Sequence, residues 1–205
     1  MPDYREIYND VVNTNSRYTL AQNSPGFRIV LQSEAILTHL SGRSLDVGCG
    51  VGFAFEHLSN LPFQFETYGV DISNEAIAIA KERLSSKHGM QNLDNRLRAI
   101  VSQTLPFEDE HFSLVTCFDV LEHLDEPDID ATLNEIDRTL VTGGTLLCAV
   151  SCRKAGSDDK FGDNLHRTIE STDWWIDKIQ PKRAIFDGHR KQLIMWKSKT
   201  NTRTP

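Results

Sequence analysis

A glycine-rich loop that follows a short apolar run constrains the fold of this chain more than any other feature. Residues 45–52 read Leu-Asp-Val-Gly-Cys-Gly-Val-Gly. The glycines at Gly48, Gly50 and Gly52 allow the backbone to turn sharply and let a ligand approach its N–H groups. A strand, a glycine loop and a helix start in this order indicate an α/β fold. The dinucleotide fingerprint G-x-G-x-x-G is absent, because position 53 is Phe53.

The acid within this loop indicates the kind of ligand. Asp46 precedes Gly48 by two residues, and a carboxylate there is a poor neighbour for a pyrophosphate. It suits a positively charged ligand without phosphate, such as the ammonium of an amino acid. S-adenosylmethionine has that ammonium and also a sulfonium. We therefore predict that S-adenosylmethionine binds here, at Asp46, Gly48, Cys49, Gly50 and Gly52.

A second acid lies at the end of the next apolar run. Residues 68–73 read Tyr-Gly-Val-Asp-Ile-Ser, so Asp71 follows Gly52 by 19 residues. In an open parallel sheet, an acid at the end of the second strand lies beside the ribose of the cofactor. We predict that Asp71 accepts from the ribose hydroxyls, with Ile72 beside it. The alternative is that Asp71 caps the next helix, a role that Ser73 already fills.

Four segments of the chain, within about residues 40–150, resemble the class I S-adenosylmethionine-dependent methyltransferases. They are LDVGCGVG, YGVDIS, LPFEDEHFSLVTCFDVLEHL and LNEIDRTLVTGGTLLCAV. The resemblance is greatest to the group that contains the ubiquinone-biosynthesis O-methyltransferases. It implies a Rossmann-like, seven-stranded, mostly parallel sheet with helices on both faces and an antiparallel last strand. It also implies that Asp119 lies under the methionine part of the cofactor. Gln103 stands near the position of an acid that receives the adenine amino group in many relatives.

The periodicity of apolar residues predicts a single domain over residues 1–198, with a helical segment at about 1–42 and a disordered tail at 199–205. Strands are expected near 43–47, 66–70, 96–101, 112–118, 145–150, 182–187 and 191–197. Helices are expected near 26–41, 52–60 and 74–88, from Asp128 to the glycine pair at 143–144, and from about 171. The polar loop at about 151–167 is expected to form a lid over the acceptor.

The composition limits the kinds of partner that the chain is expected to bind. The net charge of −7 argues against binding to nucleic acid or to an anionic membrane. The first residues lack an apolar signal region, and no run reaches the length of a transmembrane helix, so we expect a cytoplasmic protein. The four cysteines lack metal or disulfide spacing and are expected to be free thiols. The sequence leaves the oligomeric state open.

An acidic cluster raises the question of a metal. It consists of Asp125, Glu126, Asp128 and Asp130, and hard cations such as Mg²⁺ prefer carboxylates. Negative charge also suits the first turn of a helix, because it interacts favourably with the helix dipole. We take the cluster as a helix start and predict no metal.

The acceptor side offers fewer signals. His166, on the expected lid, is predicted to take a hydroxyl proton, with His123 as its rival. His166 is otherwise a loop histidine that bonds the next helix, and His123 a packing residue. Trp174 and Trp175 are predicted to stack on a sugar, or else to belong to the core. A short stretch from Asn164 is similar to methyltransferases of polysaccharide assembly.

The preferred interpretation is therefore O-methylation of a sugar hydroxyl or a similar small polar acceptor. A quinol, phenol or natural-product O-methyltransferase remains an alternative, and so does a catalytically silent partner subunit that binds S-adenosylmethionine. A nicotinamide-dependent oxidoreductase is disfavoured by Phe53 and Asp46.

Overall fold

A computed structural model describes residues 3–62 and 65–200 of the chain. These residues form one sheet with the strand order β3-β2-β1-β4-β5-β7-β6. All neighbouring strands are parallel except β7, which is antiparallel to both β5 and β6. The predicted fold, mostly parallel with an antiparallel last strand, is confirmed. The strands are β1 (Gly42–Val47), β2 (Phe65–Asp71), β3 (Leu97–Ala99), β4 (Phe112–Phe118), β5 (Leu140–Ser151), β6 (Arg183–Asp187) and β7 (Gln192–Ser198).

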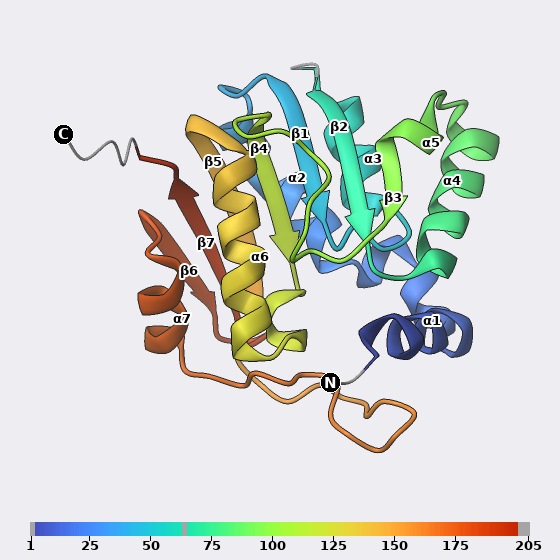
Figure 1. Ribbon diagram of the computed structural model, residues 1–205, viewed down its shortest axis with the longest axis vertical. Coiled ribbons are helices and arrows are strands. Elements are labelled where there is room, and N and C mark those ends of the chain that lie inside the picture. Colours follow the sequence, from blue (N-terminus) through green and yellow to red (C-terminus); the bar gives the residue numbers. More distant parts are fainter. Residues whose placement is uncertain (1–2, 63–64, 201–205) are drawn as a thin grey trace.

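Helices cover both faces of the sheet (Figure 1). Helix α6 lies in front of the central strands in this view, α2 and α3 lie behind them, and α4 lies beside the β3 edge. The helical segments are α1 (Tyr4–Thr14), η1 (Ser16–Thr19), η2 (Ala21–Asn23), α2 (Pro25–Leu37), α3 (Phe53–Asn60), α4 (Asn74–His88), α5 (Leu93–Arg96), η3 (Leu121–His123), α6 (Glu126–Thr139) and α7 (Thr172–Ile179).

The two faces of the central strands explain the layered core. Successive side chains of a strand point to opposite faces. In β4, Val115 and Cys117 pack with Ile129 and Ile136 of α6, whereas Leu114 packs in the cluster that contains α2 and α3. Both faces of β4 are therefore buried, and the sheet is fixed between two helical layers.

The boundaries of α6 differ from those expected. Asp125, and not Asp128, is the residue before the helix, and Pro127 occupies its first turn, where proline has no N–H to leave unpaired. The helix ends at Thr139. The glycine pair at 143–144 does not end it but lies inside β5, which begins as soon as the helix stops.

The predicted lid is a folded loop rather than an open one. Buried Asp159 accepts N–H bonds from Phe161 and Asp163 and pairs with Arg167 at 2.5 Å. In Figure 1 this loop lies at the same end of the sheet as α1, below the carboxyl ends of the parallel strands. The loop is therefore placed beside the edge at which open α/β sheets bind ligands.

The remaining predictions about the chain concern its end, its thiols and its hydropathy. The N–H of Lys199 donates to Gly144, so the expected disordered tail does not begin at 199; residues 201–205 lie outside the described residues. The four cysteines are free thiols, as predicted. Among the described residues, no helix is both long and apolar enough to cross a membrane.

Candidate functional site

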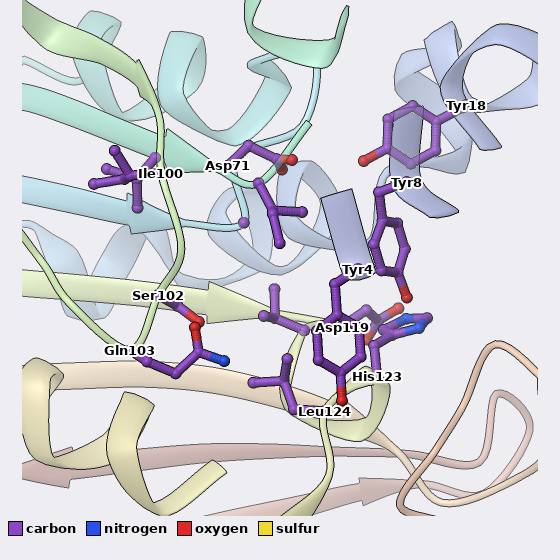
Figure 2. Close-up of a pocket in the computed structure, with 14 residues that line it drawn as sticks. Tyr4, Tyr8, Tyr18, Asp71, Ile100, Ser102, Gln103, Asp119, His123 and Leu124 are labelled. Carbon is purple, nitrogen blue, oxygen red and sulfur yellow. The ribbon is translucent and has the colours of Figure 1, made fainter. Parts of the chain in front are cut away.

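Three adjoining cavities lie at the carboxyl ends of β1, β2, β4 and β5. The first (Figure 2) is lined by Tyr4, Tyr8, Tyr18, Gly48, Val70, Asp71, Ile72, Ile100, Ser102, Gln103, Asp119, Val120, His123 and Leu124. The second shares Tyr18, Gly48, Asp119 and His123 with it and adds Asp46, Cys49, Gly50, Val51 and the segment 23–26, among others. The third shares Asp119 and residues 23–25 with the second. The predicted cofactor residues thus lie along a continuous cleft, except Gly52.

The glycine loop needs its glycines for two different reasons. Gly48 and Gly50 have φ angles of 73° and 52°, in the left-handed region that favours glycine. A Cβ on Gly50 would lie 3.0 Å from the Tyr18 hydroxyl, and one on Gly48 would collide with Val120. Gly52 (φ 84°) instead begins α3 and packs against α4, where a Cβ would lie 3.3 Å from Leu84. The first two glycines therefore shape the cleft, and the third allows close helix packing.

Asp46 is buried at the end of β1 with one oxygen unsatisfied. Thr116 donates its hydroxyl to Oδ1 at 2.7 Å, whereas Oδ2 is buried without a hydrogen-bond partner among the described residues. Burial raises the pKa of Asp46 to about 7. A buried carboxylate oxygen without a partner is costly unless a ligand satisfies it. A ligand ammonium in the second cavity would do so.

Asp71 connects the ends of β1 and β2. Its Oδ2 accepts the Gly50 N–H at 2.8 Å, and its Oδ1 accepts the Ser73 N–H at 2.9 Å. Burial raises the pKa of Asp71. Each carboxylate oxygen has a second lone pair, so Asp71 can shape the glycine loop and still accept from a ligand hydroxyl. Ser73 caps α4, as expected.

Asp119 lines all three cavities. It follows β4 with a φ of 51°, an unusual angle for a residue other than glycine. Gln192 donates its amide to Asp119 at 2.6 Å, and Arg28 donates to the other end of the same amide, also at 2.6 Å. Desolvation raises the pKa of Asp119 to about 6. This chain of contacts holds Asp119 between the cofactor side and the third cavity.

Three tyrosines of the N-terminal segment line the cleft, and the sequence analysis did not assign them to the site. Figure 2 shows Tyr4, Tyr8 and Tyr18 facing the ends of the strands. Tyr4 donates its hydroxyl to Asp125 at 3.0 Å, and the ring of Tyr8 lies edge-on to His123, with the ring centroids 5.5 Å apart. Tyr4 and Tyr8 are four residues apart in α1, the spacing that places side chains on one helix face. The four-residue spacing of Tyr4 and Tyr8 was the sequence signal that could have placed both rings on one face of a helix.

The two predicted bases lie side by side, but only His123 lines the cleft. Their rings are 4.7 Å apart. The Nδ1 of His123 donates to the Leu165 carbonyl at 2.9 Å, and the Nδ1 of His166 donates to the Arg153 carbonyl at 2.5 Å. Each Nε2 therefore keeps a lone pair. Burial lowers the pKa of both imidazoles, that of His123 to about 3. His166 is absent from the lining of the three cavities.

Glu122 lies against these two histidines. It is fully buried; its Oε1 accepts the Ser151 N–H at 2.7 Å, and its Oε2 lacks a partner among the described residues. Burial raises the pKa of this carboxyl well above its usual value. Glu122, His123 and His166 offer ligand-type atoms within 4.8 Å of one another. If the chain holds a divalent cation, these residues are the candidates; the acidic cluster instead forms the start of α6.

The tandem tryptophans lie outside the cleft. Trp175 is fully buried in the core with α6 and the sheet, so the core alternative is the one that fits it. Trp174 packs edge-on to it, with centroids 4.8 Å apart, and lies under Lys178. Neither lines any of the three cavities, and the predicted stacking of a sugar on these rings has no support in this placement.

Comparison with known proteins identifies the family. A family model described as a methyltransferase domain matches residues 45–148, half of the chain. The chain belongs to this family. It is 35% identical over 117 residues to a mitochondrial ubiquinone biosynthesis O-methyltransferase of Candida albicans, covering 57% of this chain and 34% of that protein. It is 30% identical over 151 residues to the uncharacterized methyltransferase YcgJ of Bacillus subtilis, covering 72% and 56%.

Solved structures share the fold of this family member over nearly its whole length. The PH0226 protein of Pyrococcus horikoshii aligns with a TM-score of 0.73 at 19% identity, covering 93% of this chain and 99% of that one. A SAM-dependent methyltransferase from Aquifex aeolicus aligns with a TM-score of 0.65 at 18% identity, covering 90% and 98%. The chain spans only about a third of the length of the Candida relative.

The cofactor of this methyltransferase family member is S-adenosylmethionine. The cleft fits it on independent grounds. The unsatisfied oxygen of Asp46 suits the ammonium, Asp71 offers acceptors for the ribose hydroxyls, and Gln103 lies in the first cavity with Ile72. These residues would hold the cofactor along the cleft from Gln103 to the glycine loop.

Proposed function

We propose that the chain transfers a methyl group from S-adenosylmethionine to a hydroxyl of a small polar acceptor, with a sugar or glycan favoured. The observation that supports this proposal is the third cavity, which opens from Asp119 and is lined by polar side chains. It contains Gln22, Asn23, Ser24, Arg28, Ser151, Arg153, His189, Arg190 and Gln192. Such a surface suits an acceptor with many hydroxyls better than an apolar quinol.

S-adenosylmethionine supplies a methyl group that is already activated on its sulfonium. The chain therefore needs no covalent nucleophile, and its task is alignment and exclusion of water. Asp46 would bind the ammonium of the cofactor's amino-acid portion, and Asp71 would bind the hydroxyls of its ribose. Tyr4 and Tyr8 of α1 and Tyr18 of η1 line the same cleft.

His123 replaces His166 as the proposed proton acceptor. It lines the first two cavities, and its Nδ1–H is held by a carbonyl, so that Nε2 has a free lone pair. The ring of His166, on the loop after β5, packs edge-on against the ring of His123. A base must come within hydrogen-bond reach of the acceptor oxygen, and only His123 meets the cleft.

We expect His123→Ala to lower turnover on an aliphatic hydroxyl by about 10-fold to 10²-fold. The expected loss is at the low end of general-base effects, because burial lowers the pKa of His123 to about 3 and leaves a neutral but weakly basic imidazole. Affinity for S-adenosylhomocysteine should stay within about twofold, since Asp46 and Asp71 are untouched. Steady-state kinetics and calorimetry measure the two quantities. His166→Ala is the comparison variant, with a smaller expected loss; full turnover in His123→Ala would leave alignment alone as the mechanism.

The function is tested by supplying the purified chain with methyl-labelled S-adenosylmethionine and a panel of acceptors. The panel contains sugars, uronic acids, sugar phosphates, phenols, quinols and phosphoethanolamine, since the relatives include a ubiquinone biosynthesis O-methyltransferase and a phosphoethanolamine N-methyltransferase. Labelled product should come from a sugar-type hydroxyl. Label on quinols or amines alone would overturn the choice of acceptor. Tight binding of S-adenosylhomocysteine without any turnover would favour a silent partner subunit.

A further inference from the structure

The third cavity gathers positive charge from segments far apart in the sequence. Arg28 comes from α2, Arg153 from the loop after β5, and Arg190 from the turn between β6 and β7. Asp119 is the only acid among its lining residues. The whole chain has a net charge of −7, so this cluster of cations opposes the overall charge.

These cations are only partly neutralised within the protein. Among the described residues, Arg190 has a carboxylate partner, Asp187, at 3.2 Å, whereas Arg28 and Arg153 have none. Arg28 donates to Gln192, and Arg153 donates to the carbonyl of Lys154. Burial is the main cause that lowers the pKa of Arg28; the nearby Arg190 lowers it further, and Asp187 and Asp119 partly oppose the shift. A ligand anion in the third cavity would add the carboxylate or phosphate partner that Arg153 lacks.

The arginines lie where the acceptor would bind, and not at the end of the cleft that would hold the adenosine of the cofactor. The third cavity shares no lining residue with the first except Asp119, and it meets the second at residues 23–25. Arg28 reaches Asp119 through Gln192 at the inner end of the cavity, while Arg153 and Arg190 are exposed at its outer end. An acceptor bound there would place one end beside Asp119 and the other between these two arginines.

We infer that the acceptor of this methyltransferase carries a carboxylate or a phosphate group, which Arg153 and Arg190 bind at the outer end of the third cavity. Guanidinium groups pair with both anions through two parallel N–H bonds. The inference rests on the proposed function, and it narrows the acceptor to an anionic small molecule, such as an acidic sugar.

The test uses the full chain loaded with S-adenosylhomocysteine and three matched probes: glucose, glucuronate and glucose 6-phosphate. Calorimetry or NMR titration should detect binding of at least one anionic probe at concentrations at which glucose does not bind. Arg153→Gln and Arg190→Gln should each weaken that binding about tenfold. Arg183→Gln is the control, because it removes the same charge from β6, where Arg183 lies over Trp196 outside the cavity.

Each outcome distinguishes between this inference and the proposed function. Preference for glucuronate assigns a carboxylate, and preference for glucose 6-phosphate assigns a phosphate. Equal binding of all three probes, or an equal loss in Arg183→Gln, overturns the inference. Failure to bind S-adenosylhomocysteine would instead overturn the proposed function. Should a glutamine variant unfold, the Arg→Lys variants at the same positions replace it. Lysine keeps the charge but loses the paired N–H geometry, so the affinity for the anionic probe should still fall at least severalfold.

Discussion

At the scale of single residues, Asp46 combines burial with an unsatisfied oxygen. The free carboxyl titrates near 3.8, whereas burial raises its pKa in the folded chain to about 7. Below the lower value both states hold the proton, and the group has no effect on stability. Between the two values the folded state holds a proton that the unfolded state has lost, so the free energy of unfolding falls as the pH rises. Above about 7 the full destabilisation is present.

We therefore predict that Asp46→Asn raises the free energy of unfolding of the cofactor-free chain at pH 8, by about 1–4 kcal/mol. The gain should shrink as the pH is lowered toward 4, because the wild-type carboxyl then regains its proton. Urea unfolding at several pH values measures it. The same variant should bind S-adenosylhomocysteine more weakly at pH 8, since the amide lacks the negative charge. A gain that does not change with pH would contradict the assigned cause.

At the scale of elements, α1 connects three parts of the molecule. Tyr4 bonds Asp125 at the start of α6, Arg5 donates to Asn74 at the start of α4, and Glu6 pairs with Lys160 of the loop after β5. Tyr4 also lines the first cavity. The helix also buries the side chains of Ile7 and Val12, so long-range polar contacts and an apolar face together hold it over the cleft.

We predict that binding of S-adenosylhomocysteine slows hydrogen exchange of the amides in residues 4–14, because the ligand fills the space beneath α1. Tyr4→Phe removes the hydroxyl that meets Asp125 and should speed this exchange and weaken the affinity by about 3–10-fold. Tyr68→Phe is the matched control, since its hydroxyl bonds Glu66 at the surface. Identical exchange with and without ligand would show that α1 is not a cover.

At the scale of the whole molecule, α7 contributes Trp175 to the core, and neither of its tryptophans lines the cleft. Trp175→Ala should lower the free energy of unfolding by about 3–5 kcal/mol, the usual result of deleting a buried aromatic ring. Trp174→Ala should lower it by less, because Trp174 is partly exposed. Neither change should alter the affinity of the folded chain for S-adenosylhomocysteine. A Trp175→Ala chain with normal stability and no acceptor binding would restore the stacking hypothesis.

Local patterns predicted the strands, the resemblance predicted how they form one sheet, and the predicted cofactor residues other than Gly52 line the first two cavities. The residues of the glycine loop and of the segment around Asp71 lie close together in the chain, and their backbone geometry follows from their own composition. Gln103 and Asp119 were placed by resemblance, and both line the first cavity.

The placement of the tryptophans, of α1 and of the two histidines depends on contacts between distant segments, which no local pattern encodes. Trp174 and Trp175 have the same spacing whether they stack on a ligand or pack in the core, and only the placement of α7 decides between these. The cover by α1 requires Tyr4 to meet Asp125, which is 121 residues away. The sequence analysis preferred His166 to His123, but the loop after β5 folds back through Asp159 and Arg167, and of the two only His123 lines the cleft.

The position of β7 has a consequence for the order in which the molecule is assembled during synthesis. This strand lies between β5 and β6, although it follows both in the chain. Until residues 192–198 leave the ribosome, β5 has no neighbour on one side and β6 has no partner in the sheet. Gln192, which joins Arg28 to Asp119, arrives with that strand. The strands that carry the glycine loop and Asp71 are therefore complete in the chain before the residue that closes the inner end of the third cavity has been made.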